Sequence, residues 1–384
     1  MAGSDPLLMI PGPTNLPAAV REALAGASFY HRGEHMADLL DRCTDGLRRL
    51  MGAGGDVLIL TSSGTGAVEA SITSFLCPGD RVLAVEGGKF GERMGEIART
   101  FGAEVTTLAV EPGHAVDPDD LRSALARADF QAVLCVHNET STGVTQPIAE
   151  VASAAHGGGA LLITDCVSCL GGVPVRADEW GLDVVAAGSQ KCLMLPPGLA
   201  FVGVREEVWV LAETATMPCY YFDLRRARES LHKGQTPWTP ATALIAALAA
   251  SLDLIEAEGI EAVFARHHAM AEATRAAMLA AGLRLFAQEG CRSDTVTAVH
   301  SPEGVDSVEL VRLVRERRNV LISGGQGELK GRIFRIGHMG MVDLAQIERT
   351  LQALADGLAN LGYECDATAM VDAARQAAGG WRNE

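Results

Sequence analysis

The sequence predicts an α/β protein, with a large domain built on a mostly parallel sheet and a smaller C-terminal α+β domain. Between about Val57 and Val204, short apolar runs alternate with helical stretches, which is typical of a parallel sheet covered by helices on both faces. An Ala-rich helical region over 239–285 follows, and a β-α-β-α pattern comes after it. The 384 residues, 48% of them hydrophobic, are enough to build two packed bodies.

The first 20 residues contain four prolines, so we expect residues 1–20 to run extended over the surface or onto a partner. The large domain is assigned to residues 21–257. Its expected strands are apolar runs bounded by turn residues, as in sheets buried on both faces; they lie at 57–60, 81–85, 132–136, 160–163, 182–187 and 199–204. Helices are expected at 118–126 and 148–156.

The small domain is assigned to residues 258–362, after a helix break near Gly259. Its expected elements are 295–299, 308–316, 333–337 and 344–361. Residues 363–384 are expected to form a partly ordered helical tail.

Composition narrows the possible functions. The formal net charge of −16 disfavours nucleic-acid binding, which needs a basic face. No apolar stretch approaches the roughly 20 residues that span a bilayer, so we expect no membrane association. Residues 1–5 do not lead from a basic segment into an apolar one, as a signal peptide would. Nine scattered cysteines fit reduced thiols better than a disulfide framework. We therefore expect a cytoplasmic protein.

The strongest chemical signal is Lys191, which lies 191 − 165 = 26 residues after Asp165. Each follows an apolar run that reads as a buried strand, so both side chains are expected at one crevice. Pyridoxal phosphate needs this pair: the lysine holds the cofactor aldehyde as a Schiff base, and the acid pairs with the protonated ring nitrogen. Any sheet protein offers such pairs, so other residues must support the interpretation.

Ser62-Ser63-Gly64-Thr65-Gly66-Ala67 provides that support, because it joins the run 57–60 to a helix. Small residues at a strand-to-helix turn expose backbone N–H groups, and the helix N-terminus attracts a phosphate. Alone, this segment is more often an ordinary capped turn. Because Lys191 is also present, we interpret this turn as a phosphate site.

The motifs together resemble class V aminotransferases of the alanine/serine–glyoxylate group, which are pyridoxal-phosphate enzymes of the aspartate aminotransferase fold (fold type I). The similarity runs from Pro11-Gly12-Pro13-Thr14 to about Leu361. Its strongest segments are His137-Asn138-Glu139-Thr140-Ser141-Thr142-Gly143-Val144, Gly188-Ser189-Gln190-Lys191, Leu195-Pro196-Pro197-Gly198, Thr236-Pro237-Trp238-Thr239-Pro240 and Phe334-Arg335-Ile336-Gly337-His338. Asp178-Glu179-Trp180-Gly181 favours the serine–glyoxylate branch.

The resemblance implies roles for individual residues. Lys191 is the Schiff-base lysine and proton shuttle, and Asp165 pairs with the ring nitrogen. Val167 and Phe90 cover the two faces of the ring, and Thr140 reaches a ring substituent. The cofactor phosphate is held by the turn Ser63, Gly64 and Thr65 together with Gln190, and by Thr236 and Thr239 of the neighbouring subunit in a homodimer with shared active sites. Read without the family, Thr236–Thr239 is a loop leading into a helix.

Arg335 is the expected partner of the substrate carboxylate, since a guanidinium fork can donate two parallel hydrogen bonds. It projects from an apolar strand, where a lone charge needs a partner. Gly12 is expected in the substrate pocket. We expect no metal site: Cys166-Val167-Ser168-Cys169 is a C-x-x-C, but we interpret its thiols as core residues.

These residues predict transfer of an amino group from serine or alanine to glyoxylate, giving glycine and a 2-oxo acid. The alternative is a related transaminase that uses pyruvate, with 2-aminoethylphosphonate, aspartate or another amine as donor. A cysteine desulfurase or other carbon–sulfur lyase is less favoured, because no cysteine occurs between Arg292 and Glu364. A tight pocket predicts glyoxylate as a better acceptor than pyruvate, and 2-oxoglutarate as the poorest, since its second carboxylate has no evident partner besides Arg335.

Overall fold

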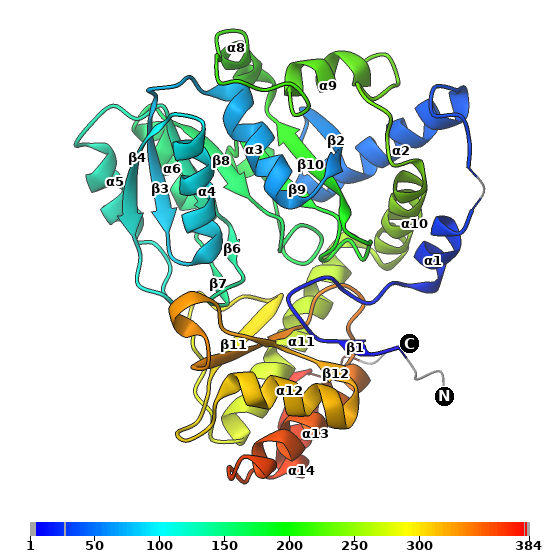
Figure 1. Ribbon diagram of the computed structural model, residues 1–384, viewed down its shortest axis with the longest axis vertical. Coiled ribbons are helices and arrows are strands. Elements are labelled where there is room, and N and C mark those ends of the chain that lie inside the picture. Colours follow the sequence, from blue (N-terminus) through cyan, green and yellow to red (C-terminus); the bar gives the residue numbers. More distant parts are fainter. Residues whose placement is uncertain (1–4, 27, 380, 382–384) are drawn as a thin grey trace.

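The computed structural model of the protein describes residues 5–26, 28–379 and 381. Two bodies, a larger and a smaller, are stacked along the long axis of the molecule (Figure 1). The ends of the two segments predicted as an N-terminal extension and a tail, residues 1–4, 380 and 382–384, lie outside the described residues.

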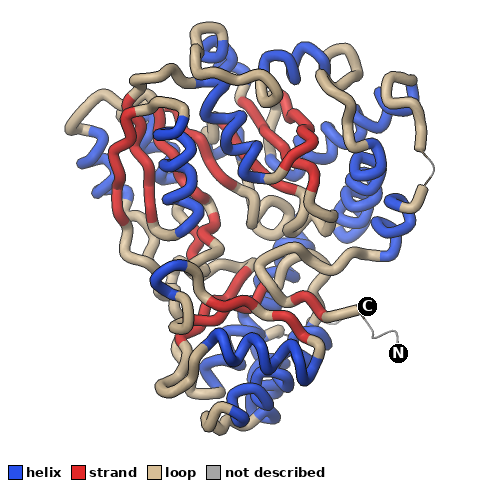
Figure 2. The backbone as a smooth tube through the Cα atoms, viewed as in Figure 1, coloured by secondary structure: helices blue, strands red, loops and turns tan. Residues whose placement is uncertain are grey.

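A seven-stranded sheet forms the centre of the larger body, and its strands stand out in Figure 2. Its order is β2 (Asp56–Ser62), β10 (Gly198–Val204), β9 (Val184–Gly188), β8 (Leu161–Asp165), β5 (Ala132–Val136), β3 (Arg81–Glu86) and β4 (Glu104–Ala109). β10 is antiparallel to both of its neighbours, whereas the adjacent pairs from β9 to β4 are parallel. The predicted mostly parallel sheet is confirmed. β4 was not among the expected strands, because it lies at the exposed edge and lacks an apolar run.

Successive residues of a strand point to opposite sides of the sheet, so each face of the sheet has its own apolar core. Helices cover both faces. One core holds Ile59, Val133 and Leu162, and the other holds Leu58, Leu134 and Ile163. The first is covered by α2 (Glu34–Met51), α5 (Pro118–Leu125), α6 (Ile148–Gly157), α7 (Ala177–Trp180) and α10 (Thr242–Glu258). The second is covered by α3 (Gly64–Phe75), α4 (Lys89–Thr100), α8 (Trp209–Ala212) and α9 (Leu224–Leu231), with the 3₁₀ turn η1 (Glu206–Val208) nearby.

The smaller body has its own sheet and its own apolar core. Its antiparallel strands are ordered β11 (Val296–His300), β14 (Ile333–Gly337) and β13 (Ser323–Gly324). The helices of this body are α11 (Ile260–Ala280), α12 (Ser307–Arg318), α13 (Leu344–Asn360) and α14 (Ala367–Ala377), with the 3₁₀ turn η2 (Gly327–Leu329). α11 and α12 contact the strands, and α13 and α14 pack against these helices and each other. A small hairpin of β6 (Asn138–Glu139) and β7 (Val144–Thr145) extends from the large sheet toward this body.

Both terminal segments are more integrated than the sequence predicted. β1 (Leu7–Leu8) is extended as expected, but it pairs with β12 (Val320–Leu321) of the smaller body, and Met9 beside it is fully buried. α1 (Ala18–Leu24) then begins inside the segment expected to be extended. The expected tail contains α14, whose Met370 lies in the core of the smaller body. The prolines of residues 1–20 predicted an extended backbone around β1, but they gave no sign that this part of the chain is buried.

Within the described part of the chain, no helix combines the length and the apolarity that crossing a bilayer requires.

Candidate active site

Asp165 and Lys191 meet at one edge of the large sheet. Asp165 is the last residue of β8, and Lys191 comes three residues after the end of β9. β8 and β9 are adjacent and parallel, with Asp165 opposite Ala186. Because the carboxyl ends of parallel strands lie at the same edge, both side chains line one cavity there, as the sequence predicted.

Burial perturbs both groups. It raises the pKa of Asp165 to about 7, although a hydrogen bond from the Val167 N–H (2.8 Å) and the nearby Lys191 oppose the shift. Burial likewise lowers the pKa of Lys191 to about 8. Its Nζ donates a hydrogen bond to the carbonyl of Pro11. A lysine whose pKa is lowered in this way is suited to accept and return protons.

The N-terminus of α3 forms one end of the cavity. Ser63, Gly64, Thr65 and Gln190 all line it. Ser63 precedes the helix but its side chain makes no capping bond, and the first N–H groups of a helix have no intrahelical partner. A Cβ on Gly64 would lie 2.5 Å from Val167, so a glycine is required for the helix and the end of β8 to meet. The buried Oε1 of Gln190 also has no hydrogen-bond partner.

Phe90, Thr140 and Val167 line the same cavity, so the structure brings together the predicted ring-facing residues. Phe90 comes from the first turn of α4, and Val167 from the turn after β8. The sequence analysis missed the other lining residues, which are Val68, Arg93, Met94, Ile97, Val136, Asn138 and Ser168. Helical spacing from Phe90 could have identified Arg93, Met94 and Ile97, which follow it on one face of α4.

Arg335 lies on β14 and is only 5% exposed; it is not among the residues that line this cavity, but it contacts one of them, Thr140. Its Nη1 donates to the carbonyl of Thr140 (3.0 Å), whereas Nε and Nη2 both donate to the carbonyl of Gly324 (3.0 and 2.8 Å). Burial lowers the pKa of the guanidinium to about 10, and the charge of Glu139 opposes this shift. A guanidinium carries five N–H donors, so two remain for a ligand, one on each terminal nitrogen.

Gly12 has a left-handed φ of +88° and packs against Lys191. A Cβ at this position would lie 2.4 Å from Lys191 Cδ and 2.9 Å from Nζ. The glycine therefore leaves room for the lysine side chain. Its predicted contact with substrate stays a prediction.

Thr236 and Thr239 do not line the cavity of their own chain. The Thr236 hydroxyl donates to the carbonyl of Trp238 (2.7 Å), and Trp238 stacks on Tyr220 and Tyr221. Their predicted contact with the cofactor of a second subunit stays a prediction.

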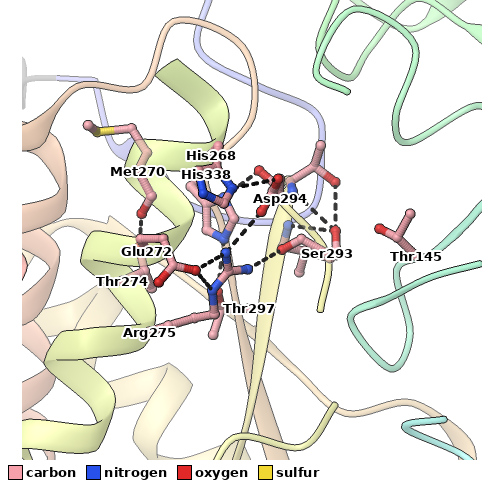
Figure 3. Close-up of polar contacts among 12 residues, drawn as sticks. Thr145, His268, Met270, Glu272, Thr274, Arg275, Ser293, Asp294, Thr297 and His338 are labelled. Atoms are coloured by element: carbon pink, nitrogen blue, oxygen red, sulfur yellow. Dashed lines mark hydrogen bonds and ion pairs between the residues drawn. The ribbon is translucent and has the colours of Figure 1, made fainter. Parts of the chain in front are cut away.

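A buried polar network supports the strand that carries Arg335 (Figure 3). His338, three residues further on, bonds Thr297 through Nε2 (2.9 Å) and the Asp294 carbonyl through Nδ1 (3.0 Å). Arg275 of α11 donates to the carboxylate of Asp294 (2.9 Å) and to the carbonyl of Ser293 (3.0 Å). Burial lowers the pKa of His338 to about 3, so the imidazole is neutral and structural. The network fastens β11, β14 and α11 to one another.

Cys166 and Cys169 are fully buried and close to His137, as expected of core thiols. Their Sγ atoms lie 3.8 and 3.5 Å from His137 Nδ1. All three donor atoms lie within 4.8 Å of one another, a juxtaposition that the sequence analysis did not anticipate. The thiol–imidazole hydrogen bonds tie the turn after Asp165 to the segment after β5.

The residues at the cavity fit pyridoxal phosphate. Uncapped N–H groups at the start of α3 suit its phosphate. Gln190 also lines the cavity, and the NH₂ group of its amide can donate, whereas its unpartnered Oε1 can only accept. Asp165 suits the protonated ring nitrogen. Burial disfavours the charged form of its carboxyl group, and a cation beside it would favour that form. Lys191 offers an amine for the aldehyde, and Phe90 and Val167 contribute apolar surface to the cavity wall.

This fold and this set of residues define a pyridoxal-phosphate-dependent enzyme of fold type I. Residues 13–338 match the aminotransferase class-V family, and the chain belongs to that family. The protein is thus a pyridoxal-phosphate-dependent aminotransferase, and its substrates are amino acids and 2-oxo acids.

The relatives that match this chain over most of its length include the following three. It is 43% identical over 362 residues to the "soluble hydrogenase, small subunit" of Synechococcus sp. (strain PCC 6716), covering 93% of this chain and 94% of the relative. It is 37% identical over 383 residues to the L-aspartate–glyoxylate aminotransferase of Paracoccus denitrificans (98% and 96%). It is also 37% identical over 346 residues to the serine–glyoxylate aminotransferase of Methylorubrum extorquens (87% and 86%).

Among solved structures, that of the pyridoxamine–pyruvate aminotransferase from Mesorhizobium loti superposes with a TM-score of 0.94. The two sequences are 29% identical, and the match covers 98% of each chain. The fold type predicted from the sequence is confirmed.

Proposed function

We propose that the protein transfers the amino group of a small amino acid, serine or alanine, to glyoxylate, giving glycine and a 2-oxo acid. The observation that carries this proposal is the arrangement of Arg335. Three of its five N–H groups are bound to Thr140 and Gly324, and the remaining two suit a single carboxylate, which every α-amino acid and α-oxo acid has. Two relatives named for glyoxylate as a substrate support the acceptor.

The side chains at the cavity then have distinct tasks. Bound pyridoxal phosphate supplies the electron sink and carries the amino group between the two substrates. Arg335 fixes the α-carboxylate, and thereby orients the Cα–H bond of the donor. Lys191 Nζ takes the proton from Cα in the first half-reaction and returns one in the second, a role for which its lowered pKa is suited. Asp165 holds the proton on the cofactor ring nitrogen through a charge-assisted hydrogen bond.

Arg93 favours a second candidate donor, aspartate. Arg93 lines the cavity, and its Cζ lies 4.9 Å from the centre of the Phe90 ring. Over the described stretches of the chain, no carboxylate forms an ion pair with Arg93. A second substrate carboxylate therefore has a possible partner in addition to Arg335. The sequence analysis ranked 2-oxoglutarate as the poorest acceptor because no such partner was evident. The relative named for aspartate and glyoxylate agrees with this alternative.

The proposal includes a homodimer in which Thr236 and Thr239 contact the cofactor phosphate of the other subunit. Its support is that both threonines are near the surface and lie outside their own cavity. Sedimentation measures the oligomeric state: a fully active monomer would contradict the shared site.

Initial rates with purified protein test the reaction. The donors are serine, alanine and aspartate, each paired with glyoxylate, pyruvate and 2-oxoglutarate. We expect glyoxylate to give the highest rate with every donor. The variant Arg93→Gln should lower the rate with aspartate and leave that with alanine unchanged if aspartate is the donor. A preference for pyruvate with 2-aminoethylphosphonate would replace the proposed reaction by the pyruvate-using alternative.

A further inference from the structure

Glu139 is a buried carboxylate whose hydrogen bonds all lead to the edge of the active site. It ends β6, directly before Thr140, and is 2% exposed. Its Oε2 accepts hydrogen bonds from the backbone N–H groups of Phe90 (3.1 Å) and Gly91 (3.0 Å). Its Oε1 accepts from the N–H (3.1 Å) and the hydroxyl of Ser141. A carboxylate withdrawn from water needs this many donors.

The two bonds to Phe90 and Gly91 cap α4 from a distant part of the chain. α4 begins at Lys89, behind Gly88, which has no side chain that could cap it. The Lys89 N–H donates to the Ser141 hydroxyl (3.0 Å), so Glu139 and Ser141 satisfy the first three N–H groups of the helix. A Cβ on Gly88 would lie 2.4 Å from the Ser141 hydroxyl oxygen, so Ser141 can come this close to the start of α4 only if residue 88 is a glycine.

The cap has a direct consequence for the cavity, because Phe90 is part of the first helical turn. Phe90 is half-buried against the second core of the large sheet, so part of its ring has no packing support. The first turn of a helix frays when its N–H groups lack partners. The position of the ring therefore depends on the carboxylate of Glu139, which lies 49 residues further along the chain.

The segment that carries the cap also touches the substrate arginine. Thr140, next to Glu139, lines the cavity, and its carbonyl accepts a hydrogen bond from Arg335 (3.0 Å). Phe90 and Arg335 are thus both positioned by two consecutive residues, Glu139 and Thr140. A displacement of β6 would move both.

We propose that Glu139 is a positioning residue, which fixes Phe90 against bound pyridoxal phosphate by capping α4. This inference rests on the proposed assignment of Phe90 to one face of the cofactor ring. Glu139 itself touches neither cofactor nor substrate in this scheme, and acts through the helix end.

The test compares Glu139→Ala and Glu139→Gln, each made in the wild-type protein and in Phe90→Ala. The dissociation constant of pyridoxal phosphate is measured by titrating cofactor-free protein, and hydrogen exchange at the Phe90 and Gly91 amides is measured in the same cofactor-free samples. We expect Glu139→Ala to weaken binding about tenfold, equivalent to about 1.4 kcal/mol, and to speed exchange at both amides. Glu139→Gln keeps one carbonyl oxygen for these N–H groups and should restore most of the affinity. Glu96→Ala, an exposed substitution on the same helix, is the control and should leave both unchanged.

The Phe90→Ala background separates positioning from general support of the fold. There, Glu139→Ala should change the dissociation constant less than twofold, because the ring through which it acts is gone. An equal loss in both backgrounds, or unchanged exchange at the two amides, would overturn the inference. If Phe90→Ala alone leaves cofactor binding unchanged, the assignment of Phe90 fails and this inference fails with it, whereas transamination measured on the wild-type enzyme still tests the proposed reaction. If Glu139→Ala does not fold, exchange and affinity are compared between Glu139→Gln and wild type: a correlated small change in both would support the proposal, and unchanged affinity together with fast exchange would contradict it.

Discussion

Replacing Arg335 with lysine tests the carboxylate site most directly. The guanidinium has two unused N–H groups, one on Nη1 and one on Nη2, after its bonds to Thr140 and Gly324. A lysine keeps the charge but has no fork, so it can replace at most one of the two hydrogen bonds to the carboxylate. One hydrogen bond to a charged group contributes about 1.5–3 kcal/mol, so kcat/KM should fall about tenfold to 150-fold.

The assay measures kcat/KM for serine or alanine with glyoxylate in Arg335→Lys and in wild type. A primary amine without an α-carboxylate serves as the internal comparison, because it does not use the fork. Arg332→Lys is the control variant: Arg332 precedes the same strand but is exposed, and we expect its kcat/KM to stay within twofold of wild type. Tm is measured for each variant to detect loss of folded protein.

Two results would refute this reasoning. An equal loss with the amino acid and with the plain amine would show that Arg335 supports β14 and Gly324 rather than the substrate. An unchanged kcat/KM for the amino acid would show that the two free N–H groups do not bind its carboxylate.

Three further predictions follow from the same site. Gly12→Ala should prevent normal placement of Lys191 and reduce the amount of cofactor bound after borohydride treatment. Gly79→Ala is the control, because Gly79 has the same φ of +88° but nothing lies within 4 Å of the added Cβ, and it should bind cofactor normally. Equal binding in the two variants would contradict the steric argument. Lys191→Ala should abolish borohydride-stable attachment and turnover, measured by mass spectrometry and initial rates, and wild-type turnover would remove Lys191 from the mechanism. In cofactor-free protein, burial raises the pKa of Asp165 from 3.8 to about 7, so the native state binds more protons than the unfolded state between these values and this contribution to stability falls as pH rises through that window. Asp165→Asn should therefore gain stability relative to wild type from pH 4 to pH 7 and show no further gain above it, as urea unfolding will measure; a constant difference across the window would show that burial does not control this carboxyl.

Local sequence patterns predicted six of the seven strands of the large sheet and placed Asp165 and Lys191 at one crevice, and the resemblance to the family supplied their roles. The run 132–136 became β5, because a strand buried on both faces is apolar throughout. Residues 333–337 became β14, in which Arg335 is the one charged residue among apolar neighbours. Asp165 and Lys191 could be placed together because each ends or follows such a strand. The small residues 62–66 predicted the helix start that faces the cavity. Each of these inferences depends only on neighbours in the chain.

The tertiary structure decided what depends on contacts between distant segments. The order of the strands, the pairing of β1 with β12 and the strand β4 at the sheet edge leave no local pattern. The same holds for the cap that Glu139 places on α4, and for the carbonyls that hold Arg335. Periodicity reports which face of an element is buried, but not which partner covers it. That choice is made by long-range packing and by the need of each buried polar group for a hydrogen bond.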